Sequence, residues 1–306
     1  MSVLFNKMLL FLVLMALGYV SARRGLLKPD FTKGLSWLTM NVLLTATILN
    51  AAFSDGAELG LGEIGTVLLL FTLAFAFSYA LGCAVTRLLR VKSDKAPIFE
   101  LLISGLNSMF IGLPVLQALY PGDQRVVLYM AVSCLPFNFI LFSYGVWRLC
   151  GGGHGTVRWR DMLSMPMVST LLALPILLLR PPIPAVLREL TATIAGATVP
   201  MSMIVVGASL GRVRLLDAFK DGSLYLAAFF RLLIVPVLVW LLLDRFRTGP
   251  GLLTETIFIT MACPSAVLVS VLAIQYGKDA EYASEGVLLS TALSLFTIPL
   301  LAALLL

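Results

Sequence analysis

Charged residues are scarce in this sequence of 306 residues. Asp, Glu, Lys and Arg make up 12% of it, whereas 59% of the residues are hydrophobic and the mean hydropathy is +0.99. A soluble globular chain carries about 25% charged residues. Most apolar runs also reach the roughly 20 residues that a membrane-spanning helix needs. Composition and run length therefore exclude a soluble globular protein, including a soluble α/β fold.

Residues that bind metals or perform catalysis are scarce as well. The sequence has neither a zinc-protease helix motif with two spaced histidines nor a glycine-rich phosphate loop followed by Lys-Ser or Lys-Thr. It has one histidine, His154, and four cysteines without Cys-x-x-Cys spacing, namely Cys83, Cys134, Cys150 and Cys263. We expect buried thiols rather than disulfides, and we expect no metal, no cofactor and no enzymatic activity. The missing motifs argue against an intramembrane metalloprotease and an ATP-driven pump.

Long apolar segments account for nearly the whole chain. The first segment ends in Val20-Ser21-Ala22, which resembles a signal-peptide cleavage site, but positive charges follow the apolar run instead of preceding it. That order is typical of a membrane anchor. The sequence thus predicts an all-α membrane protein with ten transmembrane helices and no separate soluble domain. The segments are residues 3–22, 35–54, 64–86, 97–119, 126–149, 162–180, 189–211, 221–243, 252–275 and 284–305.

Positive charges alternate from one side of the membrane to the other. Fifteen of the 22 Lys and Arg residues lie in loops after odd-numbered segments, six lie on the opposite side, and Arg231 lies inside a segment. The loop at 54–63 is acidic and has neither Lys nor Arg. The positive-inside rule places loops rich in Lys and Arg in the cytoplasm. We therefore predict a multi-pass protein of the cytoplasmic membrane with both termini outside, a lipid bilayer as partner and no nucleic-acid partner.

A glycine-rich linker at residues 151–161 divides the chain into a first repeat, 1–150, and a second repeat, 162–306. Each repeat has five segments, so the second copy must enter the membrane from the opposite side, which makes the repeats inverted. Sliding the first half forward by 156 residues superimposes most segments, Tyr120 on Tyr276 and Asp123 on Asp279. Ten evenly spaced helices would look periodic by themselves, but the matched details favour internal duplication.

The fourth and ninth segments are interrupted at matching places. The first interruption runs from Asn107 to Pro114 and the second from Met261 to Ser265. A proline cannot donate the helix hydrogen bond, and an unwound helix in lipid persists only where protein, water or a ligand satisfies its backbone. Paired interruptions indicate a transporter's substrate site, although two structural proline kinks would produce the same pattern. We expect the two broken helices to cross.

The polar and small residues of the interruptions are the candidate substrate-binding residues. Half-helix N-termini carry partial positive charge, which suits an anion, and Gly112 would ease an irregular backbone. Other Ser and Thr residues within the segments are expected to form hydrogen bonds with their own helix backbone or with a neighbouring helix. The small residues from Gly207 to Gly211 predict close helix packing or a polar opening. The candidates are Asn107, Ser108, Gly112, Pro114, Pro264 and Ser265, together with Asn138 and Asn41 from other segments.

Three of the ionisable residues inside apolar segments, Glu100, Glu255 and Arg231, are candidates for coupling or charge. Glu100 and Glu255 align within one position under the offset of 156. Each either favours its helix N-terminus or takes part in ion coupling. Arg231 has Phe75 at the matching place. It either extends toward the cytoplasmic face or faces the interior and attracts an anion.

Three short motifs resemble those of the auxin efflux carrier family of secondary transporters, in a compact bacterial form. They are Phe110-Ile-Gly-Leu-Pro114, Pro264-Ser265-Ala266, and the spaced Ser290, Thr291, Ser294, Thr297 and Pro299. The resemblance implies a fold similar to sodium/proton antiporters and bile-acid symporters, with a scaffold domain and a transport domain that carries the crossed helices. It implies transport of small organic anions, with Asn107 near the substrate, and leaves room for a homodimer through the scaffold domain.

Together these features predict a secondary transporter that works by alternating access. The expected substrate is a small organic anion, a mono- or dicarboxylate that is malate-like, malonate-like or auxin-like. An ion-coupled symporter or antiporter of another solute and a channel are the alternatives. Coupling is open between membrane potential alone, protons through Glu100 or Glu255, and Na⁺ held by carbonyls.

Overall fold

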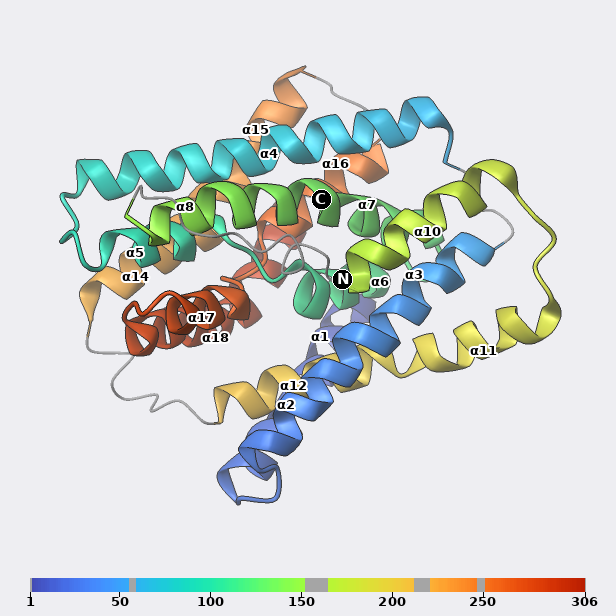
Figure 1. The fold of residues 1–306 in the computed structure, drawn as a ribbon, viewed down its shortest axis with the longest axis horizontal. Coiled ribbons are helices and arrows are strands. Elements are labelled where there is room, and N and C mark those ends of the chain that lie inside the picture. Colours follow the sequence, from blue (N-terminus) through green and yellow to red (C-terminus); the bar gives the residue numbers. More distant parts are fainter. Residues whose placement is uncertain (1, 55–58, 152–164, 212–220, 247–250, 306) are drawn as a thin grey trace. The chain divides into compact units, whose positions relative to one another are not determined.

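The structure is a computed structural model that describes residues 2–54, 59–151, 165–211, 221–246 and 251–305 (Figure 1). Over these residues the secondary structure is helical and contains no β-strand, which confirms the predicted all-α class. The predicted linker at 151–161 lies outside the described residues from 152 onward, and so does His154.

Helices fall on each of the ten predicted apolar segments. Six are long and apolar enough to cross a membrane, judged by length and composition: Pro29–Phe53, Leu61–Leu88, Gln124–Leu149, Ala185–Leu210, Gly222–Arg245 and Ala280–Leu305. The others are shorter or interrupted: Leu9–Arg23, Ser108–Leu119, Met165–Leu179 and Gly251–Met261. The chain is therefore a multi-pass membrane protein by these criteria, while a total of ten spans stays a prediction.

The chain forms two compact units, each assembled from both halves of the sequence. Unit 1 consists of Met1–Leu69, Met109–Leu135 and Leu163–Arg212. Its helices are α1 (Ser2–Arg23), α2 (Pro29–Leu38), α3 (Leu44–Phe53), α6 (Leu113–Leu119), α10 (Met165–Leu179), α11 (Ala185–Gly196) and α12 (Thr198–Leu210), with the first parts of α4 (Leu61–Leu88) and α7 (Gln124–Ile140). Helix α3 lies beside α10 and α11 (Figure 1).

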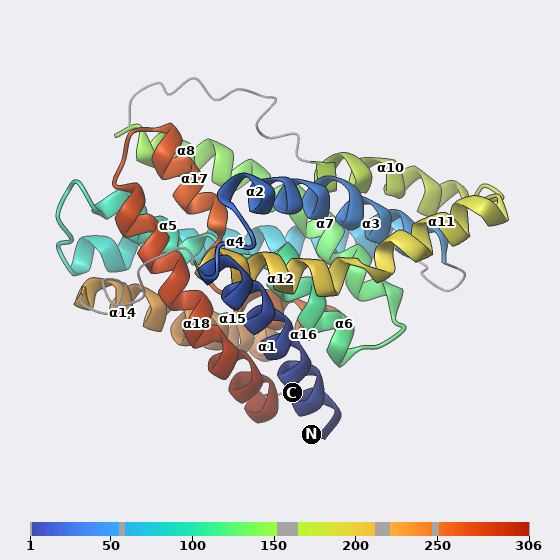
Figure 2. The same ribbon diagram turned by 90° about the horizontal axis from the view of Figure 1, so that it is seen from below.

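Helices α1 and α12 of unit 1 pack backbone to backbone (Figure 2). A Cβ atom added at Gly207 would clash with the carbonyl of Met15, and one added at Gly18 would clash with the carbonyl of Ile204. Small residues permit such close approach between membrane helices. Of the two interpretations of the Gly207–Gly211 stretch, close packing is therefore confirmed.

Hydroxyl groups join further helices of unit 1. The Thr47 and Thr198 hydroxyls are 2.8 Å apart, and Thr198 also donates to the carbonyl of Leu43 at 3.1 Å. Leu43 ends a π-helical turn, η1 (Thr39–Leu43), and its carbonyl also accepts from the Thr47 hydroxyl at 2.9 Å. Other Ser and Thr hydroxyls donate to a carbonyl one turn earlier in their own helix, as Thr39, Thr86 and Ser209 do, so both predicted kinds of bond occur.

Unit 2 consists of Leu70–Ser108, Pro136–Met162 and Val213–Leu306. Its α18 packs against α5, α14 and α17, and Phe75 contacts the rings of Phe71 and Phe137 in the core. Besides the remaining parts of α4 and α7, its elements are α5 (Ala96–Ser104), η3 (Leu141–Gly145), α8 (Val146–Leu149), α14 (Gly222–Phe229), η4 (Phe230–Ile234), α15 (Val235–Phe246), α16 (Gly251–Met261), α17 (Val267–Gln275) and α18 (Ala280–Leu305).

The Tyr and Asp residues that match under the offset of 156 occupy similar places relative to the helices in both halves. Tyr120 ends α6 and Tyr276 ends α17, and each is followed by a tight turn with a positive-φ glycine. Asp123 then accepts a backbone hydrogen bond from Arg125 at 3.0 Å, and Asp279 accepts one from Tyr282 at 2.9 Å. Both aspartates thereby cap the following helix.

Candidate substrate site

The two interruptions lie side by side in unit 2. Helix α5 ends at Ser104 and α16 ends at Met261, and extended backbone follows. The Asn107 N–H donates to the carbonyl of Pro264 at 2.8 Å, and the Ala266 N–H donates to the carbonyl of Gly105 at 3.2 Å. Leu106 and Ser265 face each other as an isolated antiparallel pair. The unwound stretches therefore satisfy part of each other's backbone, as burial in an apolar medium demands.

Ser265 anchors the second interruption to its neighbours. Its buried hydroxyl donates to the carbonyl of Leu102 at 2.6 Å, and its N–H donates to the Ser290 hydroxyl at 3.1 Å. The O–H of Ser265 is thus committed to the α5 backbone. Ser265 lies at the interruption, as the sequence predicts, but its contacts hold the backbone of the interruption against α5 and α18.

Asn107 and Ser108 keep free polar groups at the interruption. Both residues are nearly buried, with exposed fractions of 7% and 6%. Within the described part of the chain neither side chain has a hydrogen-bond partner, and neither has its polar atoms sealed from solvent. The carboxamide offers two donors and an acceptor, and the hydroxyl offers one donor. This pair is able to bind a polar ligand without first breaking an internal bond.

Gly112 and Pro114 lie beyond the irregular backbone, contrary to the expectation for Gly112. The stretch from Ser108 to Gly112 is a π-helical turn, and Gly112 has ordinary helical angles (φ −62°, ψ −48°). Pro114 falls in the first turn of α6, where its missing N–H is not needed. The break is therefore at Gly105–Asn107. The boundary between the units follows Ser108, so Gly112 and Pro114 belong to unit 1.

Arg231 is fully buried within η4 and binds the ends of both interrupted helices. Its Nε donates to the carbonyl of Cys263 at 2.8 Å, Nη1 donates to the carbonyl of Ile103 at 3.0 Å, and Nη2 donates to the carbonyl of Met261. No carboxylate of the described residues forms an ion pair with it. It faces the interior and does not extend toward the membrane surface, so the snorkelling interpretation is wrong.

Glu100 is buried in the middle of α5 and is paired. It accepts a hydrogen bond from the Tyr144 hydroxyl at 2.5 Å and one from the Arg148 Nε at 2.9 Å. Tyr144 and Arg148 stand four residues apart, which places them on one helix face. Glu255 is only half-buried in α16 and has a partner of its own. The aligned glutamates therefore have different environments.

The two asparagines from other segments are not free ligands. Asn41 donates from Nδ2 to the carbonyl of Trp37 at 2.8 Å, one turn earlier in its own helix in unit 1. Asn138 is buried in α7, in the part that belongs to unit 2, and has a partner. Asn107 and Ser108 remain as the unpartnered polar candidates from the sequence.

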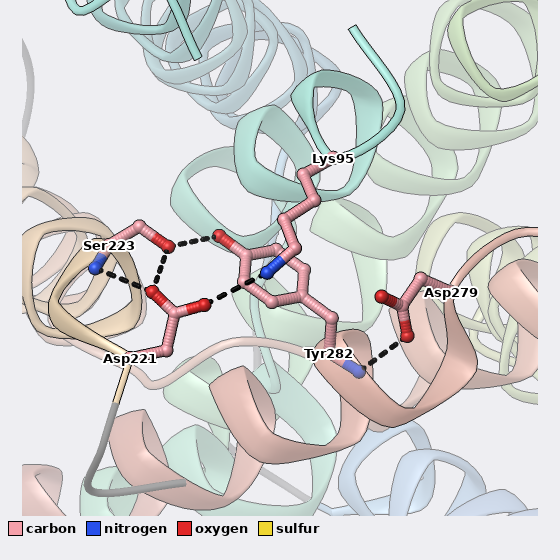
Figure 3. A network of polar contacts seen from close by, with 5 residues as sticks. All are labelled: Lys95, Asp221, Ser223, Asp279 and Tyr282. Carbon is pink, nitrogen blue, oxygen red and sulfur yellow. Dashed lines mark hydrogen bonds and ion pairs between the residues drawn. The ribbon is translucent and has the colours of Figure 1, made fainter. Parts of the chain in front are cut away.

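A polar network joins the N-terminal ends of α5, α14 and α18 in unit 2 (Figure 3). Lys95 pairs with Asp221 at 2.9 Å and lies 4.3 Å from the ring centre of Tyr282, whose hydroxyl is 2.8 Å from that of Ser223. The hydrogen bond to Asp221 raises the pKa of Lys95. Burial alone raises the pKa of Asp221, but hydrogen bonds from Ser223 and Lys95 outweigh it, so the net shift is downward. The topology predicted from the sequence puts Lys95, Asp221 and Asp279 on the same side of the membrane.

Comparison with known proteins shows the family to which the sequence belongs. The membrane transport protein family matches residues 3–150 and 154–302. The chain belongs to this family of membrane transporters. It is 26% identical over 297 residues to an uncharacterized transporter of Methanothermobacter thermautotrophicus, covering 94% of each chain. It is 25% identical over 308 residues to one of Methanocaldococcus jannaschii, covering 96% of each. The resemblance to auxin efflux carriers is thereby confirmed.

Sequence reasoning missed the residues that support the site of this transporter. Ser78 approaches Nη1 of Arg231 at 3.5 Å, Ser290 fixes Ser265, and Arg148 with Tyr144 pairs with Glu100. The spacing of Tyr144 and Arg148 was a usable signal, because it puts a cation and a phenol on one face. No group of three or more His, Cys, Asp or Glu able to hold a metal occurs among the described residues.

Proposed function

We propose that this transporter carries a small organic anion across the cytoplasmic membrane by alternating access, with a mono- or dicarboxylate such as malate or malonate as substrate. The observation that carries the proposal is the pair of unpartnered side chains, Asn107 and Ser108, beside two interlocked helix interruptions. A transporter of this design binds substrate where helices are discontinuous.

The chemistry around these side chains favours an anion. An amide N–H and a hydroxyl donate well to a carboxylate, and hydrogen bonds to a charged group are the stronger ones. Helix α17 begins after the second interruption and presents its partly positive N-terminal end. The guanidinium of Arg231 adds a full positive charge, whereas the charge of Glu100 in α5 is balanced by Arg148. The local charge thus disfavours a cationic substrate.

We further propose ten spans in two inverted repeats, 1–150 and 162–306, with both termini outside. The matching turns that end at Asp123 and Asp279 support the duplication. Two contacts support the topology, because each joins residues that it puts on one side of the membrane. Lys95 pairs with Asp221 on the cytoplasmic side, and the Tyr129 hydroxyl donates to Glu63 on the outer side. A homodimer through the scaffold domain stays a prediction.

Counterflow in proteoliposomes tests the proposal. Vesicles preloaded with unlabelled malate, malonate, lactate or indole-3-acetate should accumulate the labelled compound transiently, and the uptake should saturate. Vesicles with the Asn107→Ala variant, matched for inserted protein, are the control. Flux that does not saturate and shows no counterflow would indicate a channel. Absence of flux for every carboxylate, together with flux of another solute, would overturn the anion proposal.

A further inference from the structure

We infer that Arg231 is a built-in cation that fills the position in which an ion-coupled carrier would bind Na⁺, so that transport by this chain needs no sodium. The claim that Arg231 occupies a cation site depends only on its hydrogen bonds, whereas the consequence for transport rests on the proposed function.

The oxygens around the guanidinium form a cation site. They are the carbonyls of Ile103, Met261 and Cys263 and the hydroxyl of Ser78, contributed by α4, α5 and the end of α16. Ser78, Ile103, Met261 and Cys263 are all completely buried. Carbonyls at unwound helix ends are the groups that coordinate Na⁺ in transporters with discontinuous helices. Here the side chain of Arg231 already occupies that position.

The charges balance without a carboxylate. Each helix C-terminus carries about −0.5 elementary charge. The carbonyls that bind Arg231 terminate two helices, α5 and α16, which together supply about one negative charge. The guanidinium supplies one positive charge. Without it, two partly negative helix ends would face each other in an apolar interior with their carbonyls unsatisfied, which is costly.

Only one half of the sequence supplies this cation. The residue that matches Arg231 under the offset of 156 is Phe75, whose ring is fully buried and packs on Phe71 and Phe137. One side chain on η4 therefore serves both interrupted helices. Because Arg231 is completely buried and four of its five N–H groups form hydrogen bonds within the protein, it acts on a substrate through its charge and not as a direct ligand.

Thermal unfolding of the purified protein tests the cation position without any transport assay. The wild-type midpoint should be equal in NaCl and in choline chloride at the same ionic strength. Arg231→Ala should lower the midpoint, and millimolar methylguanidinium should restore part of it in a saturable way, because a ligand that binds only the folded state raises its stability. Arg231→Met, which fills the space without a charge, should not respond to methylguanidinium.

Arg125→Ala, which removes a half-exposed partner of Asp123, should show no guanidinium rescue. If Arg231→Ala does not fold, Arg231→Lys should still fold and stay indifferent to Na⁺. A saturable Na⁺-dependent rise in the wild-type midpoint would overturn the inference, as would a folded Arg231→Ala that ignores methylguanidinium. If methylguanidinium rescues Arg231→Ala but the wild-type protein shows no carboxylate counterflow, the proposed substrate is wrong and the role of Arg231 as a built-in cation stands.

Discussion

Asn107 donates its backbone N–H to the carbonyl of Pro264 at 2.8 Å, which joins the two interrupted helices by their main chains. The bond fixes the position of Asn107 without using its side chain. The backbone of Asn107 is therefore held at the crossing of the two interruptions, and its carboxamide is left free for a ligand.

Replacing Asn107 by Ala should weaken substrate binding without preventing insertion. A hydrogen bond to a charged group contributes about 1.5–3 kcal/mol, or roughly ten- to a hundredfold in affinity. The concentration dependence of counterflow measures this loss. Asn41→Ala is the matched control, since the Asn41 amide already bonds to Trp37 in its own helix, and it should leave the half-saturating concentration within about twofold. Equal effects of the two variants would remove Asn107 from the site.

Gly207→Ala should destabilise unit 1 strongly. The added methyl would meet the Met15 main chain, which cannot move aside as a flexible side chain can. Overpacking of this kind costs about 1–3 kcal/mol or more. Gly196→Ala in α11, where nothing lies within 4 Å of an added Cβ, should be neutral. Fluorescence-detected size-exclusion chromatography after heating compares the two; a stable Gly207→Ala protein would contradict the close α1–α12 contact.

Arg148→Met should destabilise the protein because it leaves Glu100 buried without its cation. Removing one partner of a buried ion pair costs about 3–5 kcal/mol, and the lower end applies because the Arg148 side chain is 24% exposed. The double variant Glu100→Gln with Arg148→Met should recover part of the loss, since the amide oxygen can still accept from Tyr144. Thermal midpoints of the single and double variants give the coupling. Additive losses would show that the two residues act independently.

The Lys95–Asp221 pair should stabilise the protein over a wide and predictable pH range. Its contribution is complete above the ordinary pKa of Asp221, 3.8, and below that of Lys95, 10.5. It is lost as pH falls through the lowered pKa of Asp221 or rises through the raised pKa of Lys95. Lys95→Met should therefore lower the thermal midpoint by the same amount from about pH 5 to about pH 9.

The size of that effect is modest, because each side chain of the pair is about a third exposed and such pairs contribute about 0.2–1 kcal/mol. Lys33→Met is the control, since Lys33 and Asp30 are almost fully exposed at 4.0 Å and should contribute nothing measurable. A midpoint difference for Lys95→Met that varies between pH 5 and pH 9 would mean that another group titrates with the pair.

Helices and their interruptions were predictable because both depend on local properties. The length of each apolar run predicts a helix, and the dipeptides Pro264-Ser265 and Asn107-Ser108 mark the two interruptions. The conformation of Gly112 was not predictable, because it depends on a π-helical turn that begins at Ser108. The partners of Arg231 were hidden for a deeper reason: they are backbone carbonyls, which every residue has, so no side-chain pattern marks them. The partner of Glu100 required knowing that α8 lies against α5.

The covalent attachment of the Arg231 cation has an energetic consequence. A bound ion crosses the membrane and is released, so its gradient does work in each cycle, whereas a side chain returns with the protein and does none. If no proton is coupled either, the only charge moved per cycle is that of the substrate. An elementary charge gains about 2.3 kcal/mol per 100 mV, enough for a roughly fiftyfold gradient. With a negative cell interior, transport of the proposed anion without a coupled ion would therefore be electrogenic and directed outward, and a dianion would be driven twice as hard.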